Sequence, residues 1–489
     1  MNFRRLINQI VALACLAMVS ACYNYDRDIV DGVNTGDCYI SLAISVSNGS
    51  KYATRAGEKP AAGEDGDGRE AGFERENTVT GITLILYKDA TGINTTSDPT
   101  LDLVRYFPVT ERATGTMPIE VTYTTGDQPI GRPNLDYSGT YHAIVVANAP
   151  EVAASLVEGT SKLSDVRDAT SSTLYFGNPK MVAANCSRFV MSSEQDNTIN
   201  FGSVTPTEDA SGDMHFDLTS QAIVIERMAA RVDFWAKGAT YDDTYPTSGY
   251  VYQPWKATDT TVPTSDDRFV VTCITPFNMN AGNEYLLKRT NDAAKYLADE
   301  TGTNYVIDPT TSTKTGTATP ATFVNALSSI ASLTDLSSND YCHTIEAMQG
   351  SSTASSTIDG KENIVVCYPM ENTLPDESPL YYYATGIAIE GDYYTDNNKS
   401  DPTKREHRIY FGYIRHQGES ATSYDALLPS ELDATVKTSS AKPMNFGIVR
   451  NNIYRISIDK VLEKDGAPKI KIKIEEEKWR HVDNPEIYI

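Results

Sequence analysis

Short runs of alternating apolar and polar residues dominate the chain. In the first run, Ile40, Leu42, Ile44 and Val46 occupy every second position and small residues lie between them. Alternation with a period of two is typical of a strand with one buried face. Comparable β-like runs follow at 81–87, 101–107, 141–147, 222–224, 230–235, 269–274, 363–368, 380–389, 407–414, 452–460 and 469–474. The pattern predicts a chain built mostly of strands.

Helical spacing is confined to a few short segments. We predict helices at 148–159, which has Pro150 in its first turn, at 285–299, and from Pro320 through Leu327 and Ile330. No sequence unit repeats at a fixed period, which argues against a propeller or a solenoid. The prediction is an all-β chain with a few short helices, in two tandem β-sandwich-like domains. The mixed stretch 237–267 places the boundary, so we assign 56–236 to the N-terminal domain and 237–489 to the C-terminal one.

The first 22 residues have the character of an export signal. Arg4 and Arg5 precede a run of small and apolar residues at 6–21 that is too short to span a bilayer comfortably. The run ends Val19-Ser20-Ala21-Cys22, which resembles the bacterial lipobox, in which the cysteine carries the lipid. The alternative is an ordinary signal peptide with an incidental cysteine. Residues 23–37 are polar and acidic, as expected of a tether.

Charge and cysteine usage exclude several classes of protein. The 489 residues contain 65 Asp and Glu against 42 Lys and Arg, and the formal net charge is −23. Nucleic acid and anionic lipid are bound mainly by clustered basic residues, so both are improbable ligands. After Cys22 the cysteines are odd in number, widely spaced and without a CxxC pair, so we predict mostly buried thiols rather than a zinc site or a disulfide framework. They are Cys38, Cys186, Cys273, Cys342 and Cys367.

The sequence contains no recognisable catalytic constellation. Nucleophile elbows, metalloprotease helices and phosphate-binding glycine loops are absent. The histidines are scattered singly, and Cys342 and His343 are neighbours whose side chains would point to opposite faces of a strand. We therefore expect no catalytic residue, no metal and no cofactor. An enzyme is not excluded.

Two segments suggest instead that strands are exchanged between molecules. The polar, glycine-rich stretch 52–76, which contains Arg55, Arg69 and Arg75, is an exposed loop of the kind that proteases cut. A cut there would free the strand 40–46, and losing four aliphatic side chains at ~2 kcal/mol each would cost about 8 kcal/mol. The groove would need a new strand.

The C-terminus supplies candidate replacements. Lys and Ile alternate at 469–474, and the chain finishes Ile487-Tyr488-Ile489. These segments are either edge strands of their own domain or strands donated to another molecule by β-strand addition. The residues that would enter such a groove are Ile470, Ile472, Ile474, Ile487 and Ile489.

Several segments together resemble the fimbrillins of Bacteroidales, the FimA/Mfa-type (type V) pilins, and most closely the Mfa-type major subunits. They are the lipobox, Thr54-Arg55-Ala56-Gly57-Glu58, and residues 141–150, 226–233, 446–455 and 470–479. The resemblance implies transthyretin-like β-sandwich domains and a structural role in adhesion. It also implies a lipoprotein, attached through palmitate or a similar acyl chain on Cys22 and moved to the cell outer membrane.

The resemblance further implies how the subunit matures. An arginine-specific protease would cut after Arg55, with Arg69 and Arg75 as alternatives. The strand 40–46 would then leave, and the last strands of one subunit would enter the neighbour's groove, giving a fimbrium on the cell surface. The expected partners are other fimbrial subunits, including anchor and tip subunits. The alternatives are an uncleaved anchor or tip subunit, or a monomeric glycan-binding surface lipoprotein that uses Trp235, Trp255, Trp479 and the tyrosines at 381–383.

Overall fold

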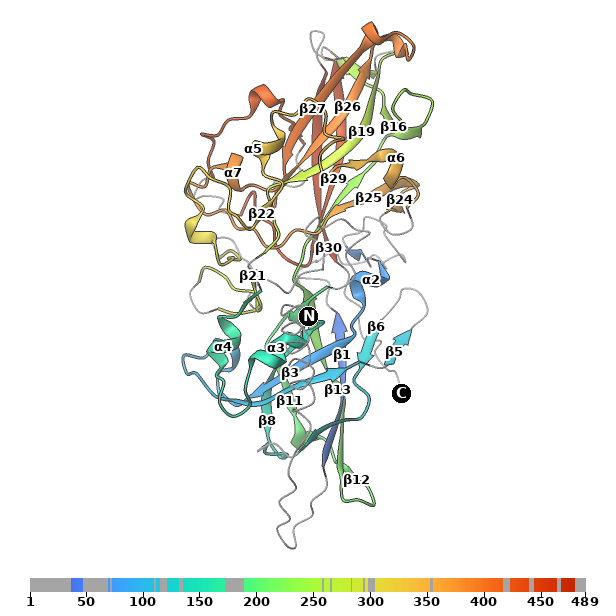
Figure 1. The fold of residues 1–489 in the computed structure, drawn as a ribbon. Coiled ribbons are helices and arrows are strands. Elements are labelled where there is room, and N and C mark those ends of the chain that lie inside the picture. The colour runs from blue at the N-terminus through green and yellow to red at the C-terminus, as the bar shows by residue number, and fades with distance from the viewer. Residues whose placement is uncertain are drawn as a thin grey trace, which may run out of the picture.

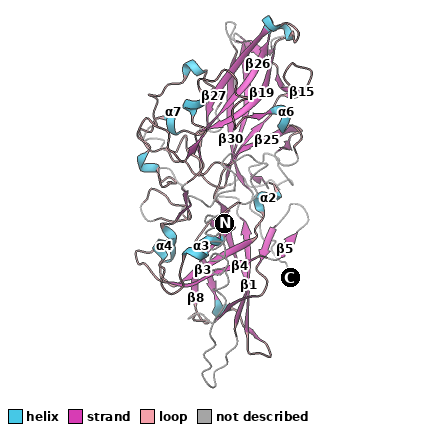
Figure 2. Ribbon diagram, in the orientation of Figure 1, coloured by secondary structure: helices cyan, strands magenta, loops and turns pink. Residues whose placement is uncertain are grey.

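The computed structural model of the chain describes residues 37–46, 69–70, 73–109, 111–114, 121–131, 135–171, 189–256, 259–263, 266–282, 284–292, 295–297, 304–351, 355–416, 423–438, 444–463 and 468–479. Within these ranges strands far outweigh helices, which confirms the all-β class (Figure 2). Two β-rich units follow one another along the long axis of the molecule (Figure 1).

The N-terminal unit is one large sheet that wraps around its own core. The strand order is β4-β3-β8-β10-β13-β1-β6-β5, and β11, β12 and β7 pair with β8, β13 and β1. The bounds are β1 (Cys38–Val46), β3 (Gly81–Tyr87), β4 (Leu101–Pro108), β5 (Glu111–Thr114), β6 (Val121–Thr124), β7 (Gln128–Gly131), β8 (Thr140–Ala147), β10 (Met191–Ser193), β11 (Asn197–Asn200), β12 (Thr207–Glu208) and β13 (Met214–Arg227).

Side-chain alternation determines the two faces of this sheet. On β3, Ile82 and Leu84 enter the enclosed core, whereas Ile85 and Tyr87 point to the opposite face. That outer face is covered by α3 (Pro150–Ser155) and α4 (Leu163–Arg167), and by Leu286, Leu287 and Tyr296. The sheet is therefore buried on both sides near β3 and β8.

The C-terminal unit is a sandwich of two sheets. The larger has the order β18-β17-β29-β14-β25-β24, with β30 beside β29 and with β2 and β28 beside β30; the smaller has the order β15-β16-β19-β26-β27, with β23 on β19. The larger contains β2 (Arg69–Glu70), β14 (Arg231–Trp235), β17 (Trp255–Lys256), β18 (Asp259–Pro263), β24 (Ser355–Ile358), β25 (Lys361–Cys367), β28 (Tyr424–Asp425), β29 (Asn452–Glu463) and β30 (Lys469–Trp479). The smaller contains β15 (Thr240–Asp242), β16 (Gly249–Tyr252), β19 (Arg268–Phe277), β23 (His343–Thr344), β26 (Gly386–Tyr394) and β27 (Arg405–Tyr413).

The remaining elements are short. Two ribbons are formed by β20 (Met279–Asn280) with β22 (Phe323–Val324), and by β9 (Thr170–Ser171) with β21 (Glu284–Tyr285). The other α-helices are α2 (Glu74–Asn77), α5 (Leu327–Ile330), α6 (Ile345–Met348) and α7 (Leu380–Tyr383). Single 3₁₀ turns are η2 (Gly92–Asn94), η4 (Phe201–Ser203), η5 (Thr311–Thr313), η6 (Thr395–Asn397), η7 (Pro402–Lys404) and η8 (Pro429–Glu431).

The two units are joined by a short stretch of chain and by residues of the C-terminal part that pack into the N-terminal core. β13 ends at Arg227 in the N-terminal sheet, and β14 starts at Arg231 in the larger C-terminal sheet, so the chain crosses between the units over only a few residues. Tyr368 and Ile453, which lie after the crossing, pack into the N-terminal core. The ribbon of β9 and β21 adds a second connection.

The prediction of a helix at 285–299 is wrong for the residues that the structure describes there. Leu286 and Leu287 are buried against the outer face of the N-terminal sheet, and Leu297 has a φ of 56°, outside the right-handed helical region. Packing against another part of the fold overrides the local spacing.

Two other segments also depart from the predicted secondary structure. The helix expected from Pro320 begins only at Leu327, because Phe323 and Val324 pair with β20. The β-like run 380–389 begins with one helical turn, α7, before β26 starts. The helix expected at 148–159 is confirmed in part, because the observed helix runs only from Pro150 to Ser155.

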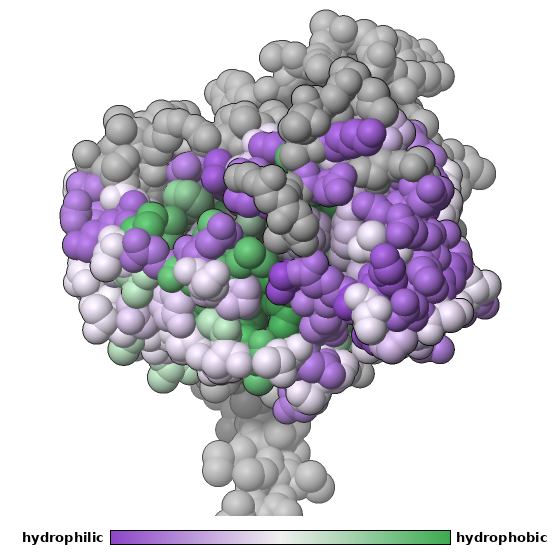
Figure 3. Space-filling model, turned by 90° about the horizontal axis from the view of Figure 1, so that it is seen from above, coloured by the Kyte–Doolittle hydropathy of each residue, from purple (hydrophilic) through white to green (hydrophobic). Residues whose placement is uncertain are grey.

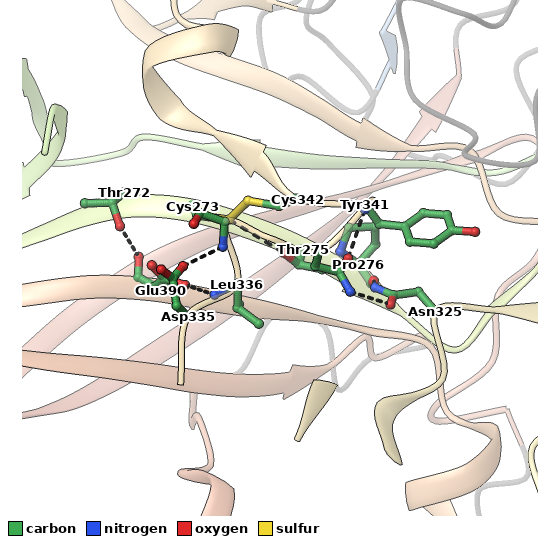
Figure 4. The surroundings of a disulfide bond; sticks show 12 residues. Thr272, Cys273, Thr275, Pro276, Asn325, Asp335, Leu336, Tyr341, Cys342 and Glu390 are labelled. Carbon is green, nitrogen blue, oxygen red and sulfur yellow. Dashed lines mark hydrogen bonds between the residues drawn. A yellow bond between two sulfur atoms is a disulfide. The ribbon is translucent and has the colours of Figure 1, made fainter. Parts of the chain in front are cut away.

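The cysteine prediction needs one correction. Cys273 on β19 and Cys342 before β23 form a disulfide across 69 residues (Figure 4). The wide sequence spacing hid this pair, because only the folded sheet brings the two sulfur atoms together. Cys38 and Cys367 are buried, as predicted. Cys186 lies outside the described residues.

Candidate functional site: the first strand and the domain junction

β1 is an interior strand of the N-terminal sheet. It pairs in parallel with β13, from Cys38 opposite Met214 to Val46 opposite Ile225. On its other edge it pairs antiparallel with β6 and β7. The first strand of the described chain therefore bridges two parts of the sheet that would otherwise be separated.

The side chains of β1 fill the N-terminal core. Ile40, Leu42 and Ile44 have no exposed surface and Val46 is 2% exposed. The backbone of Leu42 is held from both directions, since its N–H donates to Thr125 Oγ1 at 3.1 Å and its carbonyl accepts from Thr125 N at 3.2 Å. The predicted buried face is confirmed, and β1 is buried at seven of its nine positions.

The start of β1 has a separate polar attachment. The Tyr39 ring stacks on the His215 ring with centroids 4.7 Å apart, and the Asp37 N–H donates to the Asp213 carboxylate. A hydrogen bond between His215 and Asp127 raises the pKa of the imidazole, which favours its charged form. This contact lies at the surface, unlike the apolar part of the strand.

The predicted donor residues on β30 lie in the core of their own domain. Ile470, Ile472 and Ile474 are fully buried and pair antiparallel with Val461, Ile458 and Ile456 of β29. The intervening lysines face outward, and Lys471 reaches Asp425 at 3.0 Å. β28 and β2 occupy parts of the other edge of β30. The structure thus uses these isoleucines to complete the sandwich of this chain.

The segments 226–233 and 446–455 meet at the domain junction together with the segment 73–77. Arg231 forms a bidentate pair with Asp233, at 2.9 and 2.7 Å, and also reaches Glu76 at 3.2 Å. Arg227 donates through Nε to the Glu76 carbonyl at 3.0 Å and through Nη1 to Asn451 Oδ1 at 2.9 Å. Both guanidinium groups are buried, so each is stabilised by its charged and polar partners.

A second buried cluster surrounds Arg450. Its guanidinium contacts Glu371 at 2.8 and 2.9 Å and Glu284 at 3.0 Å, and it donates to the carbonyl of Tyr285 at 2.6 Å. Burial raises the pKa of Glu284 well above its usual value, and the charge of Glu371 raises it further. Through these contacts the last third of the chain fixes the segment that covers the N-terminal sheet.

Glu226 lies at the same junction with a strongly shifted acidity. It is buried and accepts from Lys288 Nζ at 3.0 Å. Burial raises its pKa to about 7, although Lys288 and Arg450 act in the opposite direction.

Neither of the two buried arginine clusters is evident from the spacing of residues in the sequence alone. The available signal is that charged residues interrupt the apolar strands at 226–233 and 450–455.

Other predicted site residues fall into two groups. Cys22, Arg55, Ile487 and Ile489 lie outside the described residues. Of the aromatic residues considered for glycan binding, Trp235 is 4% exposed and its indole N–H donates to the Ile358 carbonyl, so it is a core residue. Large exposed apolar side chains in the described part are Tyr106, Val157 and Val436. Viewed from above, most of the described surface is hydrophilic or neutral (Figure 3).

The described residues contain neither a cluster suited to a metal ion nor a helix suited to span a membrane. Among the residues that the structure describes, no group of three or more His, Cys, Asp or Glu is placed to hold a metal ion. No helix in this part of the chain is long and apolar enough to cross a membrane.

Solved structures from Bacteroidales resemble the chain over most of its length. A candidate cell-adhesion protein from Parabacteroides distasonis is 14% identical, with a TM-score of 0.42, and the match covers 91% of this chain and 98% of that chain. The chain is similar to fimbrial and cell-adhesion proteins.

Two such structures are from Porphyromonas gingivalis. The C-terminally truncated tip fimbrial protein Mfa3 is 11% identical over 91% of this chain and 100% of that chain, with a TM-score of 0.40. The fimbrilin FimA of strain W83 is 13% identical over 92% and 100%, with a TM-score of 0.37. No family model matches the chain, and no curated protein matches it.

Proposed function

We propose that the protein is a structural subunit of a cell-surface fimbria, exported as a lipoprotein through Cys22 and polymerised after proteolysis in the loop that follows β1. The observation that carries the proposal is the interior position of β1. Its departure leaves β13 and β6 without a common partner and empties the positions of Ile40, Leu42 and Ile44. Such a groove is stable only when another strand with the same alternation fills it.

Proteolysis accounts for how so well-packed a strand leaves. Removing the four apolar side chains of β1 from the core costs about 8 kcal/mol, on the order of the stability of a whole domain. While the loop is intact, β1 is an intramolecular partner that a separate strand does not readily displace. After a cut at Arg55, β1 becomes a separate peptide, and an incoming strand with the same alternation offsets part of the cost of its departure.

The end of the chain is a better candidate for the donor strand than β30 is. Ile470, Ile472 and Ile474 already fill the C-terminal sandwich, so donating them would open one core to close another. Ile487 and Ile489 follow Trp479 in the sequence and have the spacing that a groove requires. We propose these two residues as the principal donor positions, and the three on β30 as the base from which the donor segment extends.

The mature N-terminus tests the proposal most directly. The full chain is expressed in a Bacteroidales host, multimers are isolated, and their N-termini are sequenced. We expect Ala56 as the first residue, and we expect Arg55→Ala to abolish multimers while Lys51→Ala, a matched loss of one cation, leaves them intact. Multimers that contain only lipidated Cys22 would contradict cleavage. Uncleaved monomers at fimbrial ends would indicate an anchor or tip subunit.

A further inference from the structure

The segment 73–77, immediately after the proposed cleavage loop, is built into the domain junction. Its central residue, Glu76, has no exposed surface, although it lies in a helix of only one turn. The Glu76 carboxylate accepts from Arg231 at 3.2 Å and from the hydroxyl of Tyr368. Arg231 lies on β14 of the C-terminal unit, and Tyr368 directly follows the end of β25 in the same unit.

The same short segment is held along its backbone. Arg227 donates to the Glu76 carbonyl at 3.0 Å and also to the Asn77 side chain. Within the segment, the Glu76 carboxylate accepts from the Phe73 N–H at 2.9 Å, and the Glu76 N–H donates to the Phe73 carbonyl at 3.0 Å. Phe73 itself packs against the N-terminal core. The contacts with Arg227, Arg231 and Tyr368 are therefore long-range, and the two contacts with Phe73 hold the helical turn itself.

From this we propose that the segment 73–77 is the fastening point of the processed chain, meaning the segment that holds its new N-terminal part to the folded domains. Cleavage that permits assembly must then fall before Phe73. The inference rests on the proposed function, because it excludes one of the three arginines of the loop, Arg75, as the productive cleavage site. Arg55 precedes the fastening point, whereas the bond between Arg75 and Glu76 lies inside it. Cleavage at Arg75 is then both slow and destructive.

Two physical effects protect the bond between Arg75 and Glu76. A protease binds several residues in extended form, so α2 must first unfold and withdraw Glu76 from Arg231 and Tyr368. Hydrolysis would also convert the Glu76 N–H into an ammonium and the Arg75 carbonyl into a carboxylate. Both new charged groups would lie at a buried site, where a charge without a partner is strongly disfavoured.

Limited digestion of the purified, unpolymerised full chain with trypsin tests this inference. Mass spectrometry follows the appearance of new N-termini at Ala56 and at Glu76, each normalised to its rate in the urea-unfolded chain. We expect Glu76 termini to form at least ~100-fold more slowly, since opening requires loss of several buried polar contacts. Equal normalised rates at the two sites would overturn the inference.

Tyr368→Phe provides a variant that leaves the cleavage sequence unchanged. It removes only the hydroxyl that donates to Glu76, and we expect Glu76 termini to appear roughly tenfold faster. Tyr106→Phe removes a hydroxyl at an exposed position and serves as the matched control, with no change expected. If Tyr368→Phe behaves like Tyr106→Phe, the fastening role is wrong. Because no polymer is involved, this result is independent of whether the protein assembles into fimbriae.

Discussion

Gly412 on β27 of the smaller C-terminal sheet faces the side chain of Ile472 on β30 of the larger one. A β-carbon at Gly412 would come 2.1 Å from Cδ1 of Ile472, a distance that non-bonded carbon atoms do not tolerate. The two sheets of the C-terminal sandwich thus approach each other closely where a predicted donor residue points inward. β30 is fitted to its own domain at this position.

This contact predicts a specific pair of substitutions. Gly412→Ala should lower the free energy of unfolding by ~1–3 kcal/mol, because the added methyl group overpacks the core. Ile472→Val removes the conflicting Cδ1, so the double variant should be more stable than the sum of the two single effects predicts. Urea denaturation of the four proteins gives the coupling energy. Additive effects would show that β27 and β30 are not in contact here.

The acidity of Glu226 predicts a pH dependence of stability. Its folded-state pKa of about 7 lies above the usual 4.5, so the folded protein binds the proton more tightly than the unfolded chain does. The stabilisation is fully present below about pH 4.5 and is lost as the pH rises to about 7. The loss from this group is on the order of 3 kcal/mol.

Glu226→Gln isolates this contribution from those of neighbouring groups. The variant cannot titrate at this position, so its free energy of unfolding should fall less between pH 5 and 7 than that of the unmodified protein, measured by urea denaturation at each pH. Glu377→Gln, at a side chain that is 67% exposed, provides the control. Parallel curves for Glu226→Gln and the unmodified protein would contradict the raised pKa.

The disulfide between Cys273 and Cys342 should contribute measurably to stability. Closing a loop of 69 residues restricts the unfolded chain by about 4 kcal/mol. The variant with both cysteines replaced by Ala should therefore unfold at lower temperature, and reductant should affect the unmodified protein alone. Alkylation after unfolding without reductant should leave Cys273 and Cys342 unmodified. Labelling of Cys273 under those conditions would rule the disulfide out.

The donor assignment predicts different effects for neighbouring residues at the C-terminus. Ile487→Asp with Ile489→Asp should abolish multimers without lowering the melting temperature of the monomer, because the proposal places both side chains in the groove of the neighbouring subunit. Tyr488→Asp, whose side chain would point away in an alternating strand, is the matched control. Multimer formation is followed by gel electrophoresis without heating. Loss of multimers in all variants equally would argue against a specific strand register.

The sequence by itself determined the elements whose burial depends on local alternation. The strand at 40–46 is the clearest example: Ile40, Leu42, Ile44 and Val46 recur with a period of two, and all four are buried in the structure. The short helix after Pro150 is another, because a proline in the first turn is a local signal. Alternation shows which side chains of a strand face a core. This relation holds in any fold that contains the strand.

Only the tertiary structure decided which distant segments meet. Leu286 and Leu287 have apolar spacing that suits a helix, yet they cover the N-terminal sheet outside any helix, because that packing outweighs local preference. The same holds for the disulfide and for the junction of Glu76 with Arg231, whose partners are far apart in the chain. A buried ion pair is specified by geometry across strands, and no periodicity within one segment encodes it.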